Sequence, residues 1–301
     1  MYLILILYLF TVNMIRIRRL YYIKVRRIVI FLFLMTALLS CRHKVSHIKA
    51  QPHNKRITEI KDVQRQVVET EVDVNIDDIC NAKCHFDANE VLIKRKGYIV
   101  SYNKSTLIPN WVGWNLTCNH TDGEYPRDNN YYEDEGVPSP RATNEDYIGS
   151  GWSRGHMCPA GDNKWDREAM MESNLLTNIC PQDRSLNSGL WNKIEQDCRK
   201  WAKKYGIVYI VCGPILLNKE HQTIGKSRIV VPEAFYKVVL CMNPKPKAIG
   251  FVVRNNNGAK KRDQYINSVD DVERITGIDF YAALPDSIEN EVESYSNIED
   301  W

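Results

Sequence analysis

Apolar residues beyond about residue 90 follow the two-residue repeat of β-strands in several segments. Residues 97–102 (GYIVSY) alternate apolar and polar positions and end at a turn signal, which predicts a strand. Residues 206–212 (GIVYIVC) form a continuous β-branched run, as expected of a buried central strand. Residues 229–242 and 248–253 predict two further strands that are joined by a turn at 243–246.

A three- to four-residue repeat predicts two helices between and after these strands. The first covers residues 188–204 and ends before Gly206, because its apolar positions fall on one stripe: Leu190, Trp191, Ile194, Cys198, Trp201 and Ala202. The second begins at a capping box of Ser268 and Asp271 and ends at Gly277. Strands with interspersed helices, without regular βαβ alternation, indicate an α+β fold.

The first 41 residues have a different pattern. Six basic residues between Arg16 and Arg27 precede the apolar run 28–39, which predicts a secretory signal too short for a comfortable membrane span. The ending Leu38-Leu39-Ser40-Cys41 resembles a bacterial lipobox, whose cysteine is acylated; plain secretion or an uncleaved anchor is the alternative. We therefore expect an exported protein, either an outer-membrane lipoprotein or a periplasmic or extracellular one, that starts at Met1 or Met14.

Composition divides the chain into three parts: a leader (1–41), a polar tether with a possible short helix or strand (42–89) and one folded domain (90–301). The leader holds six of the 40 basic residues and none of the 37 acidic ones, so the remainder carries about three net negative charges. This balance argues against a globally basic protein that coats nucleic acid. Any affinity for phosphate must come from a local group of arginines.

Eight cysteines follow Cys41, an even number that makes some disulfides plausible in an exported chain. Cys80 and Cys84 are the easiest local pair. For the five cysteines from Cys158 onward we favour a different interpretation, in which each is a small buried apolar residue.

The segment 153–162 (SRGHMCPAGD) contains the residues with the clearest chemistry. Arg154-Gly155-His156 places an imidazole beside a guanidinium on an expected tight turn, with Gly155 permitting the turn. An imidazole is largely neutral at pH 7 and can accept a proton, while the arginine offers a fork of donors to phosphate oxygens. This combination suits the hydrolysis of a phosphodiester.

Two oxygen ligands follow on the predicted helix. Asn187 is expected to begin that helix, where its side-chain carbonyl can bind a hard cation such as Mg²⁺. Glu195 lies eight residues on, roughly 80° past two full turns, and could hydrogen-bond metal-bound water. Arg199 shares the face of Glu195 and could pair with it or reach phosphate. Each residue alone has an ordinary structural explanation, so the functional interpretation depends on their joint order and spacing.

Two blocks of sequence resemble the motifs of the DNA/RNA non-specific endonuclease family, which includes endonuclease G and belongs to the ββα-metal (His-Me finger) superfamily. The first is Asp-Arg-Gly-His running on to Pro-Ala-x-Asp, in which Ser153 stands where the family has Asp. The second runs from Asn178 through Asn187 to Glu195. The resemblance covers about residues 95–286. Its matching residues are Arg154, Gly155, His156, Pro159, Ala160, Asp162, Asn178, Ile179, Pro181, Gln182, Leu186, Asn187, Gly189, Trp191 and Glu195.

This resemblance implies a fold and a role for each site residue. The fold is a ββα-metal core within a larger, mainly antiparallel sheet flanked by helices. The general base is His156, the direct Mg²⁺ ligand is Asn187, and Mn²⁺ is expected to substitute for Mg²⁺. The remaining roles are support of the hydrated metal by Glu195, support of the histidine or phosphate by Asn178, and phosphate binding by Arg127, Arg154 and Arg199.

The implied function is a Mg²⁺-dependent, sequence-non-specific endonuclease that acts on DNA, RNA or both and leaves 5′-phosphate and 3′-hydroxyl ends. Nucleic acid is then bound through its phosphates, and a membrane is contacted only through the N-terminal lipid or leader. A homodimer is possible. The alternatives are a catalytically silent extracellular lipoprotein that binds nucleic acid, and an enzyme that hydrolyses small phosphodiesters.

Overall fold

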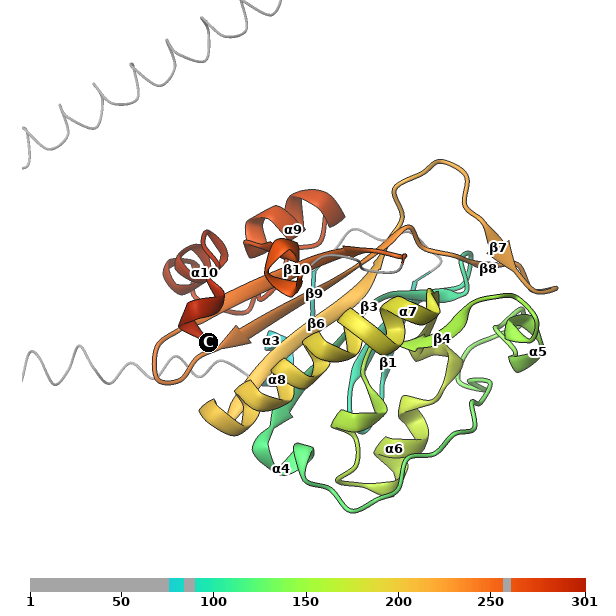
Figure 1. Cartoon of the computed structure of the whole chain (residues 1–301), viewed down its shortest axis with the longest axis horizontal. Helices are drawn as coiled ribbons and strands as arrows, with labels where there is room; N and C mark the ends of the chain where they lie inside the picture. The colour runs from blue at the N-terminus through green and yellow to red at the C-terminus, as the bar shows by residue number, and fades with distance from the viewer. Residues whose placement is uncertain (1–75, 84–89, 257–260) are drawn as a thin grey trace, which may run out of the picture. The chain divides into compact units, whose positions relative to one another are not determined.

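In the computed structural model, one antiparallel sheet runs through the domain in the order β1-β2-β3-β6-β9-β10-β11 (Figure 1). The strands are β1 (Glu90–Lys94), β2 (Ile99–Asn103), β3 (Ile108–Thr117), β6 (Ile207–Ile215), β9 (Ala234–Cys241), β10 (Lys247–Arg254) and β11 (Ile266–Asn267). Two small two-stranded sheets accompany it, one of β4 (Ser153–His156) and β5 (Ile179–Gln182) and one of β7 (Thr223–Ile224) and β8 (Ile229–Val230).

The structure describes residues 76–83, 90–256 and 261–301, all within one compact unit that ends at Trp301. The predicted leader and most of the predicted tether lie outside these residues, so the division of the chain stays a prediction. Residues 76–83 of that tether contribute Ile79 to the buried core, and Lys83 forms a β-bridge with Asp279. None of the described helices has the length and apolar character needed to span a membrane.

Helices and helical turns fill the connections. They are α3 (Ile76–Ile79), α4 (Cys118–Thr121), α5 (Asn144–Tyr147), η1 (Ala160–Asp162), α6 (Arg167–Ser173), η2 (Leu176–Asn178), α7 (Arg184–Leu186), η3 (Asn187–Trp191), α8 (Asn192–Tyr205), η4 (Arg262–Tyr265), α9 (Val269–Thr276), α10 (Asp286–Glu293) and η5 (Ile298–Asp300). The prediction for α9 is confirmed, because the Ser268 hydroxyl accepts a hydrogen bond from Asp271 N and Gly277 ends the helix at φ 72°.

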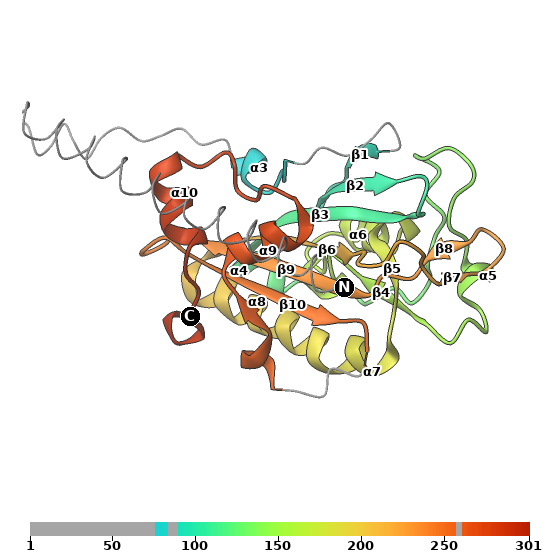
Figure 2. The ribbon, with the colours of Figure 1, turned by 90° about the horizontal axis from the view of Figure 1, so that it is seen from above.

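The large sheet has a buried core on each face, because its strands are apolar on both sides. Along β6, Val208, Ile210 and Cys212 join one cluster, while Tyr209 and Val211 join the other. The first cluster includes residues of α8 and of the β4–β5 hairpin, and the second includes residues of α9 and α10. Figures 1 and 2 show the corresponding layers, with α8 on one side of the sheet and α9 and α10 on the other.

The expected strand 229–242 is wrong in its first part. Ile229–Val230 pairs with Thr223–Ile224 in the small sheet, and the long strand β9 begins only at Ala234. Pro232 lies between the two segments, and it has no N–H with which to continue a ladder.

The predicted helix 188–204 also begins differently. The chain is helical from Arg184, after the N-cap Asp183, so Asn187 does not start the helix. Residues 187–191 form a π-helical turn in which Gly189 departs from helical geometry at φ −100° and ψ −105°. The 80° offset expected between Asn187 and Glu195 assumed a regular α-helix and therefore does not apply.

The five cysteines from Cys158 onward are buried free thiols, as predicted: Cys158, Cys180, Cys198, Cys212 and Cys241. Cys84 lies outside the described residues, so its pairing with Cys80 stays a prediction.

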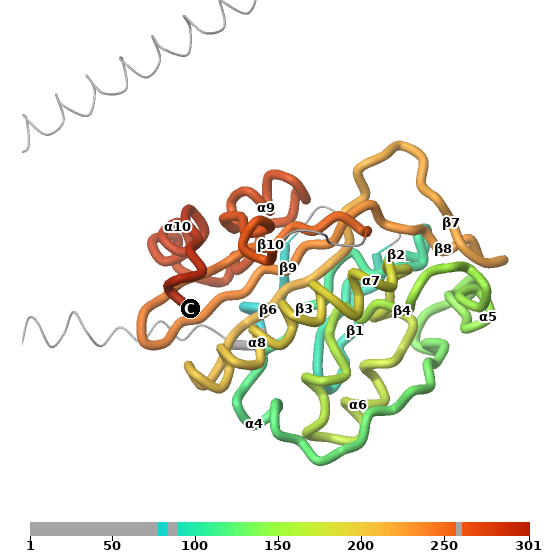
Figure 3. The backbone as a smooth tube through the Cα atoms, viewed as in Figure 1, coloured from blue at the N-terminus to red at the C-terminus, as the bar shows by residue number. Residues whose placement is uncertain are grey.

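The tube in Figure 3 follows the long connection 122–152 from α4 past α6 to α5 and then into β4. This connection brings Arg127 and Tyr131 to the hairpin that carries His156.

The cap at Asp183 leads to a prediction about the helix that carries Asn187. Its carboxylate accepts hydrogen bonds of 2.9 Å from both Ser185 N and Leu186 N. We expect Asp183→Ala to lower the free energy of unfolding by about 1 kcal/mol, measured by urea denaturation. Asp183→Asn keeps an acceptor and serves as the control, with a smaller loss. Equal stability of Asp183→Ala and the unchanged protein would contradict the role of this cap.

Candidate active site

The β4–β5 hairpin positions the two residues that the sequence singled out first. Arg154 and His156 are two residues apart in β4, so their side chains lie on the same face of the hairpin. The predicted tight turn is wrong, because Gly155 lies inside the strand opposite Cys180. Glycine is required there for a different reason: a Cβ atom would lie 2.3 Å from Gln182 Oε1.

Hydrogen bonding fixes the tautomer of His156. Its Nε2 lies 2.8 Å from Asn174 Oδ1, while Asn174 Nδ2 donates to Asp128 O at 2.9 Å. Because the amide nitrogen of Asn174 is committed to a carbonyl, the atom facing the ring is an acceptor, and Nε2 must carry the proton. Nδ1 of His156 therefore holds the lone pair, and no described residue donates a hydrogen bond to it.

Burial keeps this imidazole neutral. His156 is 6% exposed, and the Tyr131 ring packs against it with a centroid distance of 5.5 Å. This burial lowers the pKa of His156 to about 4; the bond to Asn174 acts in the opposite direction, and the charge of Arg127 lowers the pKa further. The ring is consequently unprotonated throughout the neutral range and able to accept a proton.

Arg154 is held rigidly beside the histidine. Its guanidinium lies over the rings of Tyr131 and Tyr147, at 5.3 and 5.0 Å from their centroids. Its Nε and Nη2 donate to the side-chain and backbone oxygens of Asn144, at 3.1 and 2.9 Å. These bonds occupy part of its donor fork, and the rest of the half-buried guanidinium stays available to an anion.

Asn178 supports the strand of His156 instead of facing a substrate. It is fully buried, its Oδ1 accepts from Cys158 N at 2.9 Å, and its Nδ2 donates to the backbone oxygens of Cys158 and Ser173 at 2.8 and 2.7 Å. Of the two predicted roles, support of the histidine or of phosphate, these contacts favour the first, because the described partners of the Asn178 amide all lie within the fold. Asn178 supports His156 indirectly, because its hydrogen bonds hold the backbone of Cys158, two residues after the histidine.

Asn187 and Glu195 both lie on the helical segment after the hairpin and are both half-buried. Within the described residues, no group hydrogen-bonds to the Asn187 amide or to the Glu195 carboxylate. Burial raises the pKa of Glu195 to about 7, against the opposing charges of Lys237 and Arg199. A free amide oxygen and a carboxylate are hard oxygen donors of the kind that Mg²⁺ and its bound waters accept, so these residues fit the predicted metal.

Arg199 does not pair with Glu195 as the sequence suggested. Its Nη1 lies 2.7 Å from Oδ1 of Asp162, whose other oxygen accepts from Trp114 Nε1 at 3.2 Å. The Asp162 side chain is 1% exposed, so this ion pair satisfies a carboxylate that would otherwise be buried without a partner. Arg199 is thus bound to Asp162 and also contributes positive potential to Glu195. Its binding of phosphate stays a prediction.

No role was predicted for Lys237 from the sequence. It is fully buried in β9, with Nζ at 4.8 and 4.9 Å from the ring centroids of Trp114 and Trp191 and 3.5 Å from Met157 O. Burial lowers its pKa, but neighbouring thiols and the carboxylates of Glu195 and Asp162 outweigh burial and raise it. The available signal was a lysine inside a continuous apolar strand, where a charge is costly unless it is compensated.

Arg127 is the exposed arginine of the predicted set. It interacts electrostatically with His156 and with Glu195, which links the hairpin and the helix through one cation. The charge of Arg127 also opposes the rise that burial causes in the pKa of Tyr131. The binding of phosphate by Arg127 stays a prediction.

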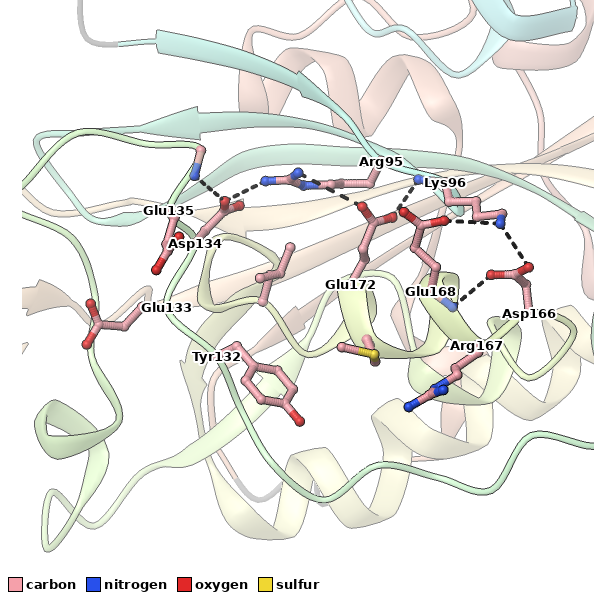
Figure 4. A pocket seen from close by; sticks show the side chains of 13 residues that line it. Arg95, Lys96, Tyr132, Glu133, Asp134, Glu135, Asp166, Arg167, Glu168 and Glu172 are labelled. Carbon is pink, nitrogen blue, oxygen red and sulfur yellow. Dashed lines mark hydrogen bonds and ion pairs between the residues drawn. The ribbon is translucent and has the colours of Figure 1, made fainter.

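A surface pocket of about 660 Å³ borders this region but has the wrong charge for nucleic acid (Figure 4). Lys96 is bound to Asp166 and Glu168 at 2.9 and 3.1 Å, and Arg95 is bound to Asp134 at 2.5 Å. Carboxylates outnumber basic groups in its lining, so a polyanion would be repelled. Its lining includes Arg95, Lys96, Arg167, Glu133, Asp134, Glu135, Asp166, Glu168 and Glu172.

A known protein family matches this chain over the region that forms the candidate site. The family model of the DNA/RNA non-specific endonucleases covers residues 76–287, which is more than half of the chain. The chain belongs to the DNA/RNA non-specific endonuclease family. The matched region contains every predicted site residue, and the hairpin followed by a helix is the arrangement expected of a ββα-metal core.

Several curated nucleases are similar to this family member. The mitochondrial nuclease EXOG of Mus musculus is 38% identical over 205 residues, covering 62% of this chain and 56% of that protein. Human mitochondrial Endonuclease G is 34% identical over 160 residues, covering 50% and 54%. Nuclease C1 of Cunninghamella echinulata var. echinulata is 32% identical over 209 residues, covering 64% and 83%. The match thus spans little more than half the length of the mouse and human proteins.

A solved structure supports the same fold. The crystal structure of an EndoG/EndoGI complex, described as giving the mechanism of EndoG inhibition, is similar with a TM-score of 0.61 and 27% identity. The likeness covers 66% of this chain and 89% of that one. The predicted α+β fold, a ββα-metal core in a larger antiparallel sheet, is confirmed.

The lowered pKa of His156 gives a prediction for stability. The unfolded chain binds a proton near pH 6.5, while the folded chain binds it only near pH 4. The contribution of the neutral His156 ring to the free energy of unfolding is therefore fully present above pH 6.5 and is lost as the pH falls through 4. Without metal, we expect the unchanged protein to lose about 3 kcal/mol more than His156→Gln between pH 7 and pH 4, measured by denaturant unfolding. Parallel losses in the two proteins would contradict a depressed pKa.

Proposed function

We propose that this chain is a metal-dependent, sequence-non-specific endonuclease that hydrolyses phosphodiester bonds of DNA, RNA or both. The observation that carries the proposal is His156, a neutral imidazole with a free Nδ1 held by Asn174 beside two arginines. Family membership supports the same activity. Phosphate contacts carry no base information, so cleavage is expected to be broad in sequence.

In this proposal each site residue of the chain has one task. His156 accepts a proton at Nδ1 from the water that attacks phosphorus in line with the leaving 3′-oxygen, and the products carry 5′-phosphate and 3′-hydroxyl ends. Asn174 keeps the ring in the required tautomer. Arg127 and Arg154 bind phosphate oxygens, with Arg127 the more accessible of the two.

Asn187 would hold Mg²⁺ directly, and Glu195 would accept hydrogen bonds from its bound water. When bound, the ion supplies positive charge that stabilises the phosphate as negative charge develops on it. Mn²⁺ is expected to substitute. Lys237 supports the Glu195 carboxylate from beneath, through its buried charge.

We also propose that the protein is exported and anchored through Cys41, so that only the N-terminal lipid or leader contacts a membrane. The sequence of residues 16–41 supports this location. We likewise propose a homodimer as one possible assembly.

Substitution of the base tests the activity. We expect His156→Ala to cut supercoiled plasmid about 10²- to 10⁴-fold more slowly than the unchanged protein in Mg²⁺, because the attacking water loses its proton acceptor. His221→Ala is the matched control. Within the described chain the His221 side chain hydrogen-bonds to Glu233, and this substitution should leave the rate unchanged. Undiminished cleavage by His156→Ala would refute the role of the base.

The metal ligand is tested by titration. We expect Asn187→Ala to need about 10- to 100-fold more Mg²⁺ for half-maximal plasmid cleavage, since the oxygen that binds the ion is gone. Asn290→Ala, on the exposed face of α10, is the control and should titrate like the unchanged protein. An unaltered Mg²⁺ requirement in Asn187→Ala would remove this residue from the metal site.

The same plasmid assay distinguishes the proposed nuclease from a catalytically silent nucleic-acid-binding protein. If the unchanged protein retards plasmid in a gel but does not cut it in Mg²⁺, the chain binds without catalysis. A chromogenic diester that is cleaved when plasmid is not would instead favour an enzyme of small phosphodiesters.

A further inference from the structure

Three carboxylates meet on the face of the sheet opposite His156. Asp270 and Glu273 come from α9 and Glu293 from α10, and one oxygen of each lies within 4.8 Å of the others. Both helices pack on the second core cluster, whereas the candidate active site packs on the first. The group is therefore separate from the nuclease chemistry.

Glu293 is the unusual member of this group. It is 5% exposed, and its Oε1 is buried without any hydrogen-bond partner among the described residues. The carboxylate is directed at the oxygens of Asp270 and Glu273. A buried carboxylate without a donor is costly, and such a group requires a compensating charge.

The surroundings do not supply that charge. Arg274 is bound to Asp271 at 2.7 Å, and Lys83 donates to Ala282 O at 3.4 Å. No lysine or arginine of the described residues forms an ion pair with Asp270, Glu273 or Glu293.

Further carboxylates add to the negative potential. Burial raises the pKa of Glu293 to about 9, and Glu273 and Glu289 reinforce this rise. Burial likewise raises the pKa of Glu273 to about 7, with a contribution from Asp279. Lys83 acts on Glu289 and only partly offsets its raised pKa. The cluster is thus neutralised either by protons or by a cation.

We propose that Asp270, Glu273 and Glu293 bind one Ca²⁺ ion that fastens α10 to α9. Two oxygens bound to the same Ca²⁺ at about 2.3–2.6 Å lie at most about 5 Å apart, which agrees with the observed spacing. Asp270 is exposed, so water can complete the coordination. An all-oxygen site with flexible geometry favours Ca²⁺ over Mg²⁺.

The ion would stabilise the C-terminal part of the domain. α10 buries Val292 against the sheet, and Ser296 beyond it donates to Ala248 O at 3.1 Å. Joining α10 to α9 removes the repulsion between their carboxylates and holds this layer on β10. The effect is on stability, and it is independent of whether the proposed nuclease activity is correct.

Thermal unfolding of the full chain, first in chelator and then in CaCl₂, tests the site. At a Ca²⁺ concentration about 100 times the Kd, we expect Tm of the unchanged protein to rise by about 5–10 °C. Glu293→Gln should unfold in chelator close to the unchanged protein at neutral pH, because Glu293 is already protonated there without a cation, and it should show no rise in Ca²⁺. Asp270→Asn, altered at an exposed position, should need at least about tenfold more Ca²⁺ for the same rise.

Two controls separate this site from other sources of calcium binding. Glu291→Gln changes an exposed carboxylate of the same helix, and Asn187→Ala removes the proposed active-site ligand; both should show the full Ca²⁺ shift. The proposal is overturned if the unchanged protein shows no shift, if Glu293→Gln shifts as much as the unchanged protein, or if Asn187→Ala loses the shift.

Discussion

The hydrogen bond between His156 and Asn174 is the interaction on which the candidate site depends. It leaves Nδ1 as the basic nitrogen, and burial beneath Tyr131 keeps the ring neutral. A histidine without this bond could adopt either tautomer. Asn174 in turn is fixed by Asp128 O, so the connection 122–152 and the helix end that carries Asn174 act together on one ring.

Buried charge is the second constraint. Lys237 lies beneath the site with no exposed surface, and it compensates Glu195 and Asp162 without a direct ion pair to either in the described chain. Arg199 takes the direct pair with Asp162. Interior cations therefore compensate the carboxylates of the site, while Arg127 is exposed at the surface.

The elements of the fold that depend on local residue patterns, and the family that depends on motifs, could be predicted from the sequence. The apolar stripe of α8, the capped helix α9 and the strands β6 and β10 follow directly from residue spacing, and the motifs around His156 and Asn187 predicted the family and fold. Side-chain partners did not follow, because they depend on tertiary contacts. Arg199 selects Asp162, 37 residues away, over Glu195 on its own helix, and the π-helical turn at Gly189 breaks the regular spacing. In the sequence, nothing distinguishes Asn174 from an ordinary residue at the end of a helix, so its bond to His156 could not be predicted.

The state of the His156 ring can be measured by a ¹⁵N NMR titration without metal, assigned by comparison with His156→Gln. We expect a neutral ring protonated at Nε2, with an unprotonated Nδ1, that takes up a second proton only near pH 4. A ring protonated at Nδ1 in its neutral form, or one that titrates near pH 6.5, would contradict it.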